Sequence, residues 1–282
     1  MSAPREDEIV VTVLGSGSSQ GVPRPALGWG DCDPRNPKNR RLRCSILIER
    51  HGPQGLTRIL IDTSPDLREQ LLAAQVDRLD AVFFTHEHAD QTHGIDDLRP
   101  VMLNMRGPID AYLNAATAAQ IVPRFAYCFA TPPGSEYPPI LSLKSIEAGA
   151  RVNVNGPGGA IQVEAFDLIH GNIHALGYRL GGLAYTPDVS DIPDSSLSAL
   201  TGLECWIIDG LRYRPHPSHF DIATALRWVE RMKPQRAVLT NLSAEVDYTI
   251  LETRLPKKVI SAYDGMIIKA SGENYGRRWS AD

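Results

Sequence analysis

The sequence predicts an α/β layer architecture, built as a single domain over residues 1–282. Short apolar runs rich in β-branched residues alternate with segments whose apolar residues recur at helical spacing, which indicates mixed strands and helices. Polar residues that can bind a metal ion stand directly after several of these runs, as ligands do in layered α/β proteins. Such residues lie on both sides of the linker-like segment 131–139, so we expect no domain boundary there.

Composition and charge exclude several classes of protein. Hydrophobic residues make up 43% of the 282 residues, which is enough for a sizeable core. The net charge of −4 and the isoelectric point near 6.1 give no overall basic field for nucleic acid. The four cysteines are scattered without a Cys-x-x-Cys pair, so we expect no disulfide framework and a cytoplasmic location. Residues 2–8 lack the apolar core of a signal peptide, and no apolar run is long enough to span a membrane.

The first half of the chain predicts five strands and three helices. Ser64 and Pro65 have the chemistry of a helix start, and Asn114 is expected to cap a later helix. We expect Asp62 to take part in the first cap, with a place near the metal site as the alternative. The predicted strands are 9–14, 44–49, 57–61, 81–85 and 109–113, and the predicted helices are 66–75, 94–105 and 114–122.

The second half predicts further strands and one long amphipathic helix. The proline-rich segment 131–139 is expected to be a loop, with a lid or a dimer contact as its candidate roles. His174 falls between predicted strands and is assigned to a loop. The predicted strands are 141–146, 151–154, 160–168, 176–180, 205–209 and, as the last core strand, 237–240; the predicted helix is 222–232.

The stretch 85–94 carries the strongest chemical signal in the chain. Three of the eight histidines, His86, His88 and His93, fall here, and Asp90 lies between them. Residues two apart do not share a helix face, but a His-x-His pair where a buried strand ends can converge on one cation. Imidazoles and a carboxylate are the ligands that zinc-like or manganese-like ions take, so we expect metal binding here.

This stretch resembles the His-x-His-x-Asp-His motif of the metallo-β-lactamase-fold hydrolases. The longer string 93–99, His-Gly-Ile-Asp-Asp-Leu-Arg, is similar to the branch of PhnP-type cyclic-phosphate phosphodiesterases, which is related to RNase Z. The resemblance implies a four-layer αββα sandwich with the metal at one edge of the sheets. It also implies the metal ligands, which are His86, His88, Asp90, His170 and Asp188.

Two departures from the family motif affect its second metal site. Gln91 and Asn241 stand where the family has histidine ligands, and both of those histidines belong to that site. Amide oxygens are weaker and harder donors than imidazole. We therefore predict one firm divalent metal site, for zinc or manganese, held by His86, His88, His170 and Asp188. A second ion would be held weakly by the aspartates and the amides, which would favour manganese-like or magnesium-like ions.

The resemblance also implies a mechanism. The histidine of the relatives that matches His219 is a catalytic acid rather than a ligand, and Asp90 is the other residue expected to act in catalysis. A divalent ion would lower the pKa of a bound water and supply hydroxide to attack phosphorus, while His219 would protonate the leaving oxygen. No Gly-x-Ser-x-Gly elbow supports a serine nucleophile.

Three residues and one basic stretch are candidates for substrate binding. A Gly/Ser loop at 15–21 follows the first strand and either presents backbone N–H groups to an anion or is an ordinary turn. In the family that this chain resembles, the similar loop lies beside the active site, so Ser16 is an expected substrate contact. Arg99 and His216 are the other expected contacts. Residues 22–43 contain several arginines, which form either a basic rim for a phosphate-bearing substrate or an ordinary solvated loop.

We expect a metal-dependent phosphodiesterase acting on a small cyclic or nucleotide-like phosphate. Hydrolysis of a lactone, a thioester or an RNA end on the same scaffold is the alternative among enzymes, although no clear nucleic-acid exosite is present in the sequence. A binding protein that keeps the fold and one metal without turnover is the alternative from another class. No membrane partner is expected, and a homodimer stays open.

Overall fold

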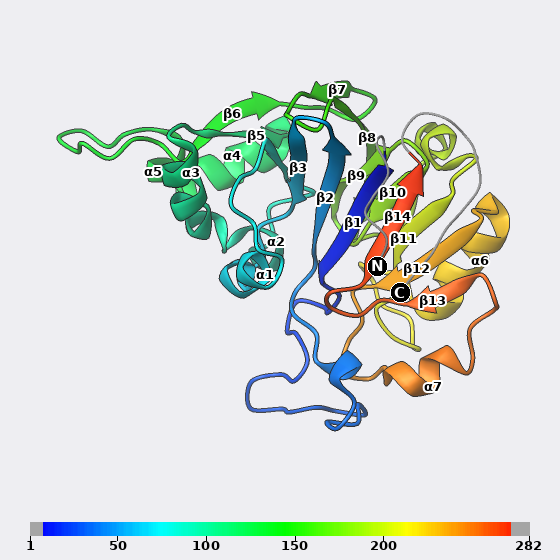
Figure 1. The fold of residues 1–282 in the computed structure, drawn as a ribbon. Coiled ribbons are helices and arrows are strands. Elements are labelled where there is room, and N and C mark those ends of the chain that lie inside the picture. Colours follow the sequence, from blue (N-terminus) through cyan, green and yellow to red (C-terminus); the bar gives the residue numbers. More distant parts are fainter. Residues whose placement is uncertain (1–7, 272–282) are drawn as a thin grey trace.

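Two seven-stranded sheets face each other in the computed structural model, which describes residues 8–271, and helices cover both outer faces (Figure 1). In order across the first sheet, the strands are β14 (Ile267–Ser271), β1 (Glu8–Gly15), β2 (Ser45–Gly52), β3 (Gly55–Ile61), β4 (Ala81–Phe83), β5 (Ile109–Leu113) and β6 (Leu141–Ser145). Across the second they are β13 (Val259–Ser261), β12 (Arg236–Thr240), β11 (Cys205–Asp209), β10 (Leu183–Thr186), β9 (Ile173–Leu180), β8 (Ile161–His170) and β7 (Arg151–Val154).

The helices divide between the two outer faces, and Figure 1 shows α1 to α5 on one side of the sheets and α6 on the other. The first group comprises α1 (Leu67–Ala73), α2 (Ala89–Thr92), α3 (Arg99–Met105), α4 (Ala115–Arg124) and α5 (Ala126–Phe129). The second comprises α6 (Ile222–Met232) and α7 (Tyr248–Glu252). The predicted four-layer αββα sandwich is therefore confirmed.

Continuous apolar runs explain why each central strand is buried on both faces. In β2, Ile46 and Ile48 point into the core between the sheets, and Leu47 points to the core under α1, α3 and α4. In β11, Ile207 points between the sheets, and Trp206 points to the core under α6. Successive side chains of a strand alternate between faces, so a sheet covered on both sides needs apolar residues at every position.

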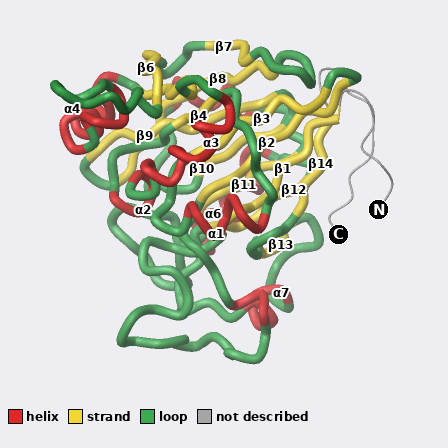
Figure 2. Tube along the Cα trace, turned by 60° about the vertical axis from the view of Figure 1, so that its left-hand side comes forward, coloured by secondary structure: helices red, strands yellow, loops and turns green. Residues whose placement is uncertain are grey.

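The strand directions bring several chain segments to one edge of the sandwich. Each sheet contains three antiparallel and three parallel pairs, and the directions of the strands are such that β3, β4, β10, β11 and β12 all end at this edge. Long loops gather there, next to α7 (Figure 2). Polar side chains placed just after these strands therefore meet, as they do at the carboxyl ends of strands in other α/β folds.

The structure differs from the sequence prediction at several places, and α5 and α7 were not predicted at all. Strand 237–240 is not the last core strand, because β13 and β14 follow and complete the second and first sheets. His174 lies within β9 rather than in a loop, where its ring pairs with Asp167. The predicted helix 94–105 is split into a 3-10 turn, Ile95–Leu98, and α3. The helix 222–232 and the Asn114 cap are confirmed.

Two predictions concern a signal peptide and membrane-spanning segments. The charged N-terminal segment lies, as far as residue 7, outside the described residues. Among residues 8–271, none of the helices combines the length and the hydrophobicity that a membrane crossing requires.

Gly94 is predicted to be essential for the packing of the metal loop. A Cβ atom at this position would collide with the carbonyl oxygen of Ser64, so Gly94→Ala should lower the free energy of unfolding by about 1–3 kcal/mol. Gly107→Ala is the matched control, because a Cβ atom there meets nothing within 4 Å. Urea denaturation of both variants measures the difference; equal stability of the two would contradict the packing argument.

Candidate metal centre

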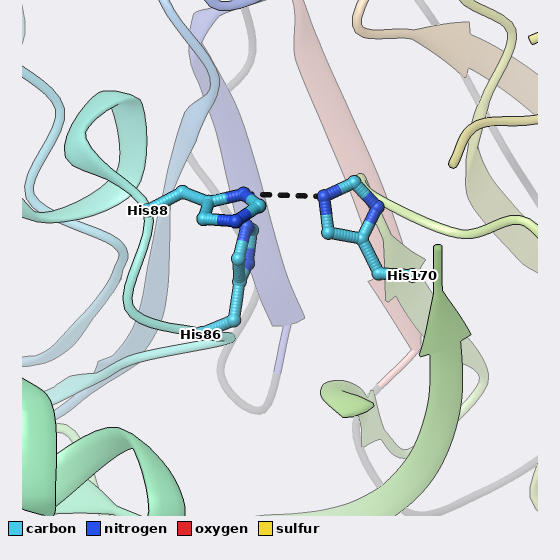
Figure 3. Close-up of side chains that lie close together, drawn as sticks. All are labelled: His86, His88 and His170. Carbon is cyan, nitrogen blue, oxygen red and sulfur yellow. Dashed lines mark hydrogen bonds between the residues drawn. The ribbon is translucent and has the colours of Figure 1, made fainter. Parts of the chain in front are cut away.

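Three histidines from two sheets converge at this edge. His86 and His88 follow β4 of the first sheet, and His170 is the last residue of β8 in the second. One nitrogen from each ring lies within 4.8 Å of the others. Nδ1 of His88 lies 3.2 Å from Nε2 of His170, and the three rings face one another (Figure 3).

The chemistry of these rings fits a divalent cation. Burial, together with the neighbouring imidazoles, lowers the pKa of His86 well below its ordinary value and lowers that of His170 to about 4. His86 and His170 are therefore neutral at pH 7, as metal ligation requires. Nε2 of His86 is buried and has no hydrogen-bond partner among the described residues. A buried nitrogen left without a partner is costly, and a bound ion would satisfy it.

Partners behind two of the rings fix their orientation. Nδ1 of His170 donates to the carbonyl oxygen of Ser218 at 2.6 Å, so its Nε2 carries the free lone pair. Nδ1 of His86 lies 3.0 Å from the hydroxyl oxygen of Thr85, which leaves Nε2 as its free nitrogen. The Asp62 carboxyl group in turn receives hydrogen bonds from the Thr85 amide and hydroxyl at 2.8 and 2.9 Å.

Asp62 therefore does not cap the helix α1, which was its first expected role. It is fully buried and is bonded to Thr85, and no side chain caps the start of α1. The alternative prediction, a place near the metal site, describes its position. Ser64 still helps to start the helix, since its hydroxyl oxygen accepts from the Asp66 amide at 3.1 Å.

A second group of ligand atoms shares His170 with the first. His170, Asp188 and His219 each offer one atom within 4.8 Å of the others. Asp188 follows β10 and is buried, and it joins this group rather than that of the three histidines. The four predicted firm ligands thus do not form one group, and His219 is a candidate ligand as well as a candidate acid. Asp90 belongs to neither group.

The two amides that replace the family's histidines both bind Asp188. Nε2 of Gln91 donates to one carboxylate oxygen at 2.9 Å, and Nδ2 of Asn241 donates to the other at 3.3 Å. Nδ2 of Asn241 also donates to the Pro187 carbonyl at 2.9 Å, and its backbone is left-handed, with φ 61°. Because a carboxylate accepts hydrogen bonds, the NH₂ side of each amide faces it, and the oxygen does not.

His219 is held by a buried carboxylate that the sequence analysis missed. Nδ1 of His219 donates to Oδ2 of Asp209 at 2.8 Å, and Asp209 is the last residue of β11. Burial alone would lower the pKa of His219, but Asp209 and then Asp188 raise it to about 9. The sequence did contain a signal for Asp209, because the apolar run 205–209 ends in this aspartate and the other site residues also stand at or after the ends of strands.

A pocket of about 350 Å³ opens beside His219, and its lining includes Ser18, Arg24, Arg212, Arg214, His216 and His219. We call it the arginine pocket. Of the three predicted substrate contacts, only His216 lines it. Ser16 is fully buried, and its amide and hydroxyl donate to Asp264. Arg99 lies on α3, where its guanidinium pairs with Asp96 at 2.7 Å.

Most cations of the stretch 22–43 have structural roles rather than forming a rim. Arg41 is buried and donates to the Ser243 carbonyl at 3.2 Å, which ties this stretch to the loop after β12. Arg43 pairs with Asp66, Arg35 pairs with Asp33, and the ammonium of Lys38 lies over two tyrosine rings. Arg24 is the one residue of this basic stretch that lines the arginine pocket.

Comparison with known proteins identifies the family. A family model described as "Beta-lactamase superfamily domain" matches residues 57–240. The chain belongs to this superfamily. The crystal structure of "a New Diphosphatase from the PhnP Family" shares 31% sequence identity, with a TM-score of 0.81, over 92% of this chain and 96% of that one. The predicted resemblance to the PhnP-like branch of the metallo-β-lactamase fold is thus confirmed.

Two further relatives show how far a relative's described activity can be applied to this chain. An octanoyltransferase from Porphyromonas gingivalis (strain ATCC BAA-308 / W83) is 36% identical over 259 residues, which are 90% of this chain and 50% of the relative. The chain thus spans about half the length of that protein. The short form of human tRNase Z shares 18% sequence identity with this chain, with a TM-score of 0.63, over 92% of this chain and 98% of the tRNase Z chain. This similarity shows a common fold alone.

His170 is predicted to be indispensable for metal binding, because both ligand groups contain it. His170→Ala should weaken zinc binding by more than the roughly 10- to 100-fold loss that outer partners of a ligand cause. His174→Ala is the matched control, since its side chain is 67% exposed and pairs with Asp167. Titration calorimetry with zinc measures both; equal affinities of the two variants would exclude His170 as a ligand.

The amide replacements are predicted to limit the number of tightly bound ions. Elemental analysis after dialysis should find about one ion per wild-type chain and about two in the Gln91→His/Asn241→His variant, because imidazoles restore nitrogen ligands beside Asp188. Two firmly held ions in the wild type would show that the amides, or other groups, complete the second site.

Proposed function

We propose that the protein is a metal-dependent hydrolase of phosphodiester or diphosphate bonds. The observation that carries the proposal is the position of His219, which belongs to a ligand group with His170 and also lines the arginine pocket. A proton donor thus lies between a site for a cation and a site for an anionic substrate. The family relation supports a reaction at phosphorus, because a relative with 31% identity is described as a diphosphatase.

The first set of residues would bind the metal ion and hold its ligands in position. His86, His88 and His170 would hold the ion, with Asp188 beside them. A bound divalent ion supplies Lewis acidity and lowers the pKa of a water. Gln91 and Asn241 hold Asp188 in place through its two oxygens.

Proton transfer is assigned to His219. Asp209 engages its Nδ1, so Nε2 is the nitrogen available to protonate the leaving oxygen. The same carboxylate keeps the ring protonated at neutral pH by raising its pKa to about 9. Arginine side chains of the pocket stabilise the charge on the phosphate oxygens.

The alternatives have less support. An acyl-transfer activity is named for a relative that has about twice the length of this chain, so that name does not identify the part which this chain resembles. The lactone or thioester group itself carries no charge for the arginine pocket to bind. A metal-binding protein without turnover remains the competing class, since Gln91 and Asn241 replace two ligands.

Hydrolysis of 2′,3′-cyclic AMP by the metal-loaded protein tests the proposal, because its alkoxide leaving group needs a proton. The acid form of His219 exists below its pKa, so the rate should fall as the pH rises through about 9. Asp209→Asn removes the carboxylate that raises this pKa, so it should shift the alkaline limb of the pH–rate profile to lower pH and reduce kcat.

The wild type and the Gln91→His/Asn241→His variant together separate the competing classes. Absence of turnover in the wild type, with gain of turnover in the double variant, would overturn the proposal in favour of a binding protein. Turnover by the wild type excludes that reading. An unchanged pH profile in Asp209→Asn would remove His219 from the role of acid.

A further inference from the structure

We propose that the arginine pocket binds the leaving group of the substrate, and that this leaving group is itself a phosphate. The inference rests on the proposed function and deepens it, because it makes the substrate a diphosphate. Hydrolysis then breaks the bond from one phosphorus to the bridging oxygen and adds the hydroxyl group of water to that phosphorus, while the other proton of water passes to solvent. The leaving phosphate takes the bridging oxygen, which receives its proton from His219.

The place of the leaving group follows from the place of the acid. A general acid must lie within hydrogen-bond reach of the oxygen that it protonates, so the leaving group has to be next to His219. His219 lines the arginine pocket, whose volume is about 350 Å³. The pocket is therefore the space into which the leaving group extends, while the other phosphorus lies at the histidine cluster.

The charges of the pocket suit a phosphate. Its lining contains three guanidinium groups and one carboxylate, that of Glu245. Arg214 neutralises this carboxylate through two hydrogen bonds, of 2.7 and 3.1 Å. Arg212 donates to the carbonyl oxygens of Arg214 and Pro215 at 3.2 and 3.0 Å, which fixes its position. A guanidinium nitrogen of Arg212 also lies 3.9 Å from Glu245, so three guanidinium groups share one carboxylate and the lining keeps a net positive charge that attracts an anion.

Arg24 is the cation best placed for this task. Its Nε is buried without a hydrogen-bond partner among residues 8–271. Its backbone is held rigidly, because its N–H and C=O exchange hydrogen bonds of 2.9 and 2.8 Å with Gly28. A guanidinium can bind two oxygens of a phosphate at once, and a fixed backbone lowers the entropy cost of that contact.

Small polar groups complete the pocket. Ser18, Ser19 and Gln20, from the Gly/Ser loop after β1, line it together with Ser243 from the loop after β12. Their hydroxyl and amide groups can donate to phosphate oxygens that the arginines do not reach. In this proposal the Gly/Ser loop contributes to anion binding through residues 18–20 rather than through Ser16.

Arg24→Gln tests the inference with two substrates. One is ADP-ribose, whose leaving group carries a phosphate; the other is the 4-nitrophenyl ester of thymidine 5′-monophosphate, whose leaving group carries none. The variant should lower kcat/KM for ADP-ribose on the order of 10- to 100-fold, the usual effect of losing a hydrogen bond between charged groups. It should leave the nitrophenyl ester within about 3-fold of the wild type.

Arg68→Gln is the matched control, because it removes the same charge from a side chain that is 69% exposed on α1 and pairs with Glu69. It should leave both substrates unchanged. Equal losses on both substrates in Arg24→Gln, or hydrolysis of the ester without hydrolysis of ADP-ribose by the wild type, would overturn the inference and leave the phosphodiesterase function standing. Thermal melting of each variant confirms that it is folded.

A binding measurement separates this inference from the proposed function. If the wild type hydrolyses neither substrate, the proposed function fails. Calorimetric titration of the metal-loaded protein with inorganic pyrophosphate then shows whether the arginine pocket binds an anion. Pyrophosphate that binds the wild type and Arg68→Gln, but binds Arg24→Gln at least 10-fold more weakly, supports an anion site. Equal binding to all three proteins, or none, overturns it.

Discussion

A carboxylate buried at the carboxyl edge of two sheets governs the arrangement of this site. Asp188 has almost no contact with solvent, and burial of an unpaired charge is strongly unfavourable. Burial raises its pKa, and the charge of His219 opposes that rise. Gln91 comes from α2, and Asn241 and His219 come from two different loops, so the compensation of one charge fixes the relative positions of segments far apart in the chain.

The fold makes that compensation possible. Both sheets pass from antiparallel to parallel pairing, so their parallel strands end at the same edge and deliver polar side chains to it. Because helices cover the outer faces, the central strands are buried on both sides and consist mainly of apolar residues. The polar residues of the site therefore lie at the ends of the strands. The loops 16–44 and 241–247 then close over this edge, with the buried Arg41 between them. The arginine pocket is built where these two loops meet the end of β11.

The sequence predicted most of the local structure and part of the site. Strands such as 205–209 and the helix 222–232 were correct because local periodicity determines them. β14 was missed because its partner, β1, lies at the other end of the chain, and pairing over that distance leaves no local pattern. Asp62 and Asp209 were not recognised as partners of Thr85 and His219, since a lone acid after a strand has many ordinary roles. The sequence left open whether the cations of 22–43 form a basic rim or a solvated loop, because composition does not tell which charges are already paired.

The backbone at Asn241 has a consequence for how this site changes over time. Its left-handed conformation is one that asparagine, aspartate and histidine adopt more readily than other residues with side chains. Asparagine and histidine codons differ by a single base, and so do glutamine and histidine codons. Each amide that holds Asp188 is therefore one mutation away from an imidazole, at positions whose backbones need not move. The chain lies two mutational steps from a site with nitrogen ligands on both sides of Asp188, and lineages can cross that distance in either direction without rebuilding the fold.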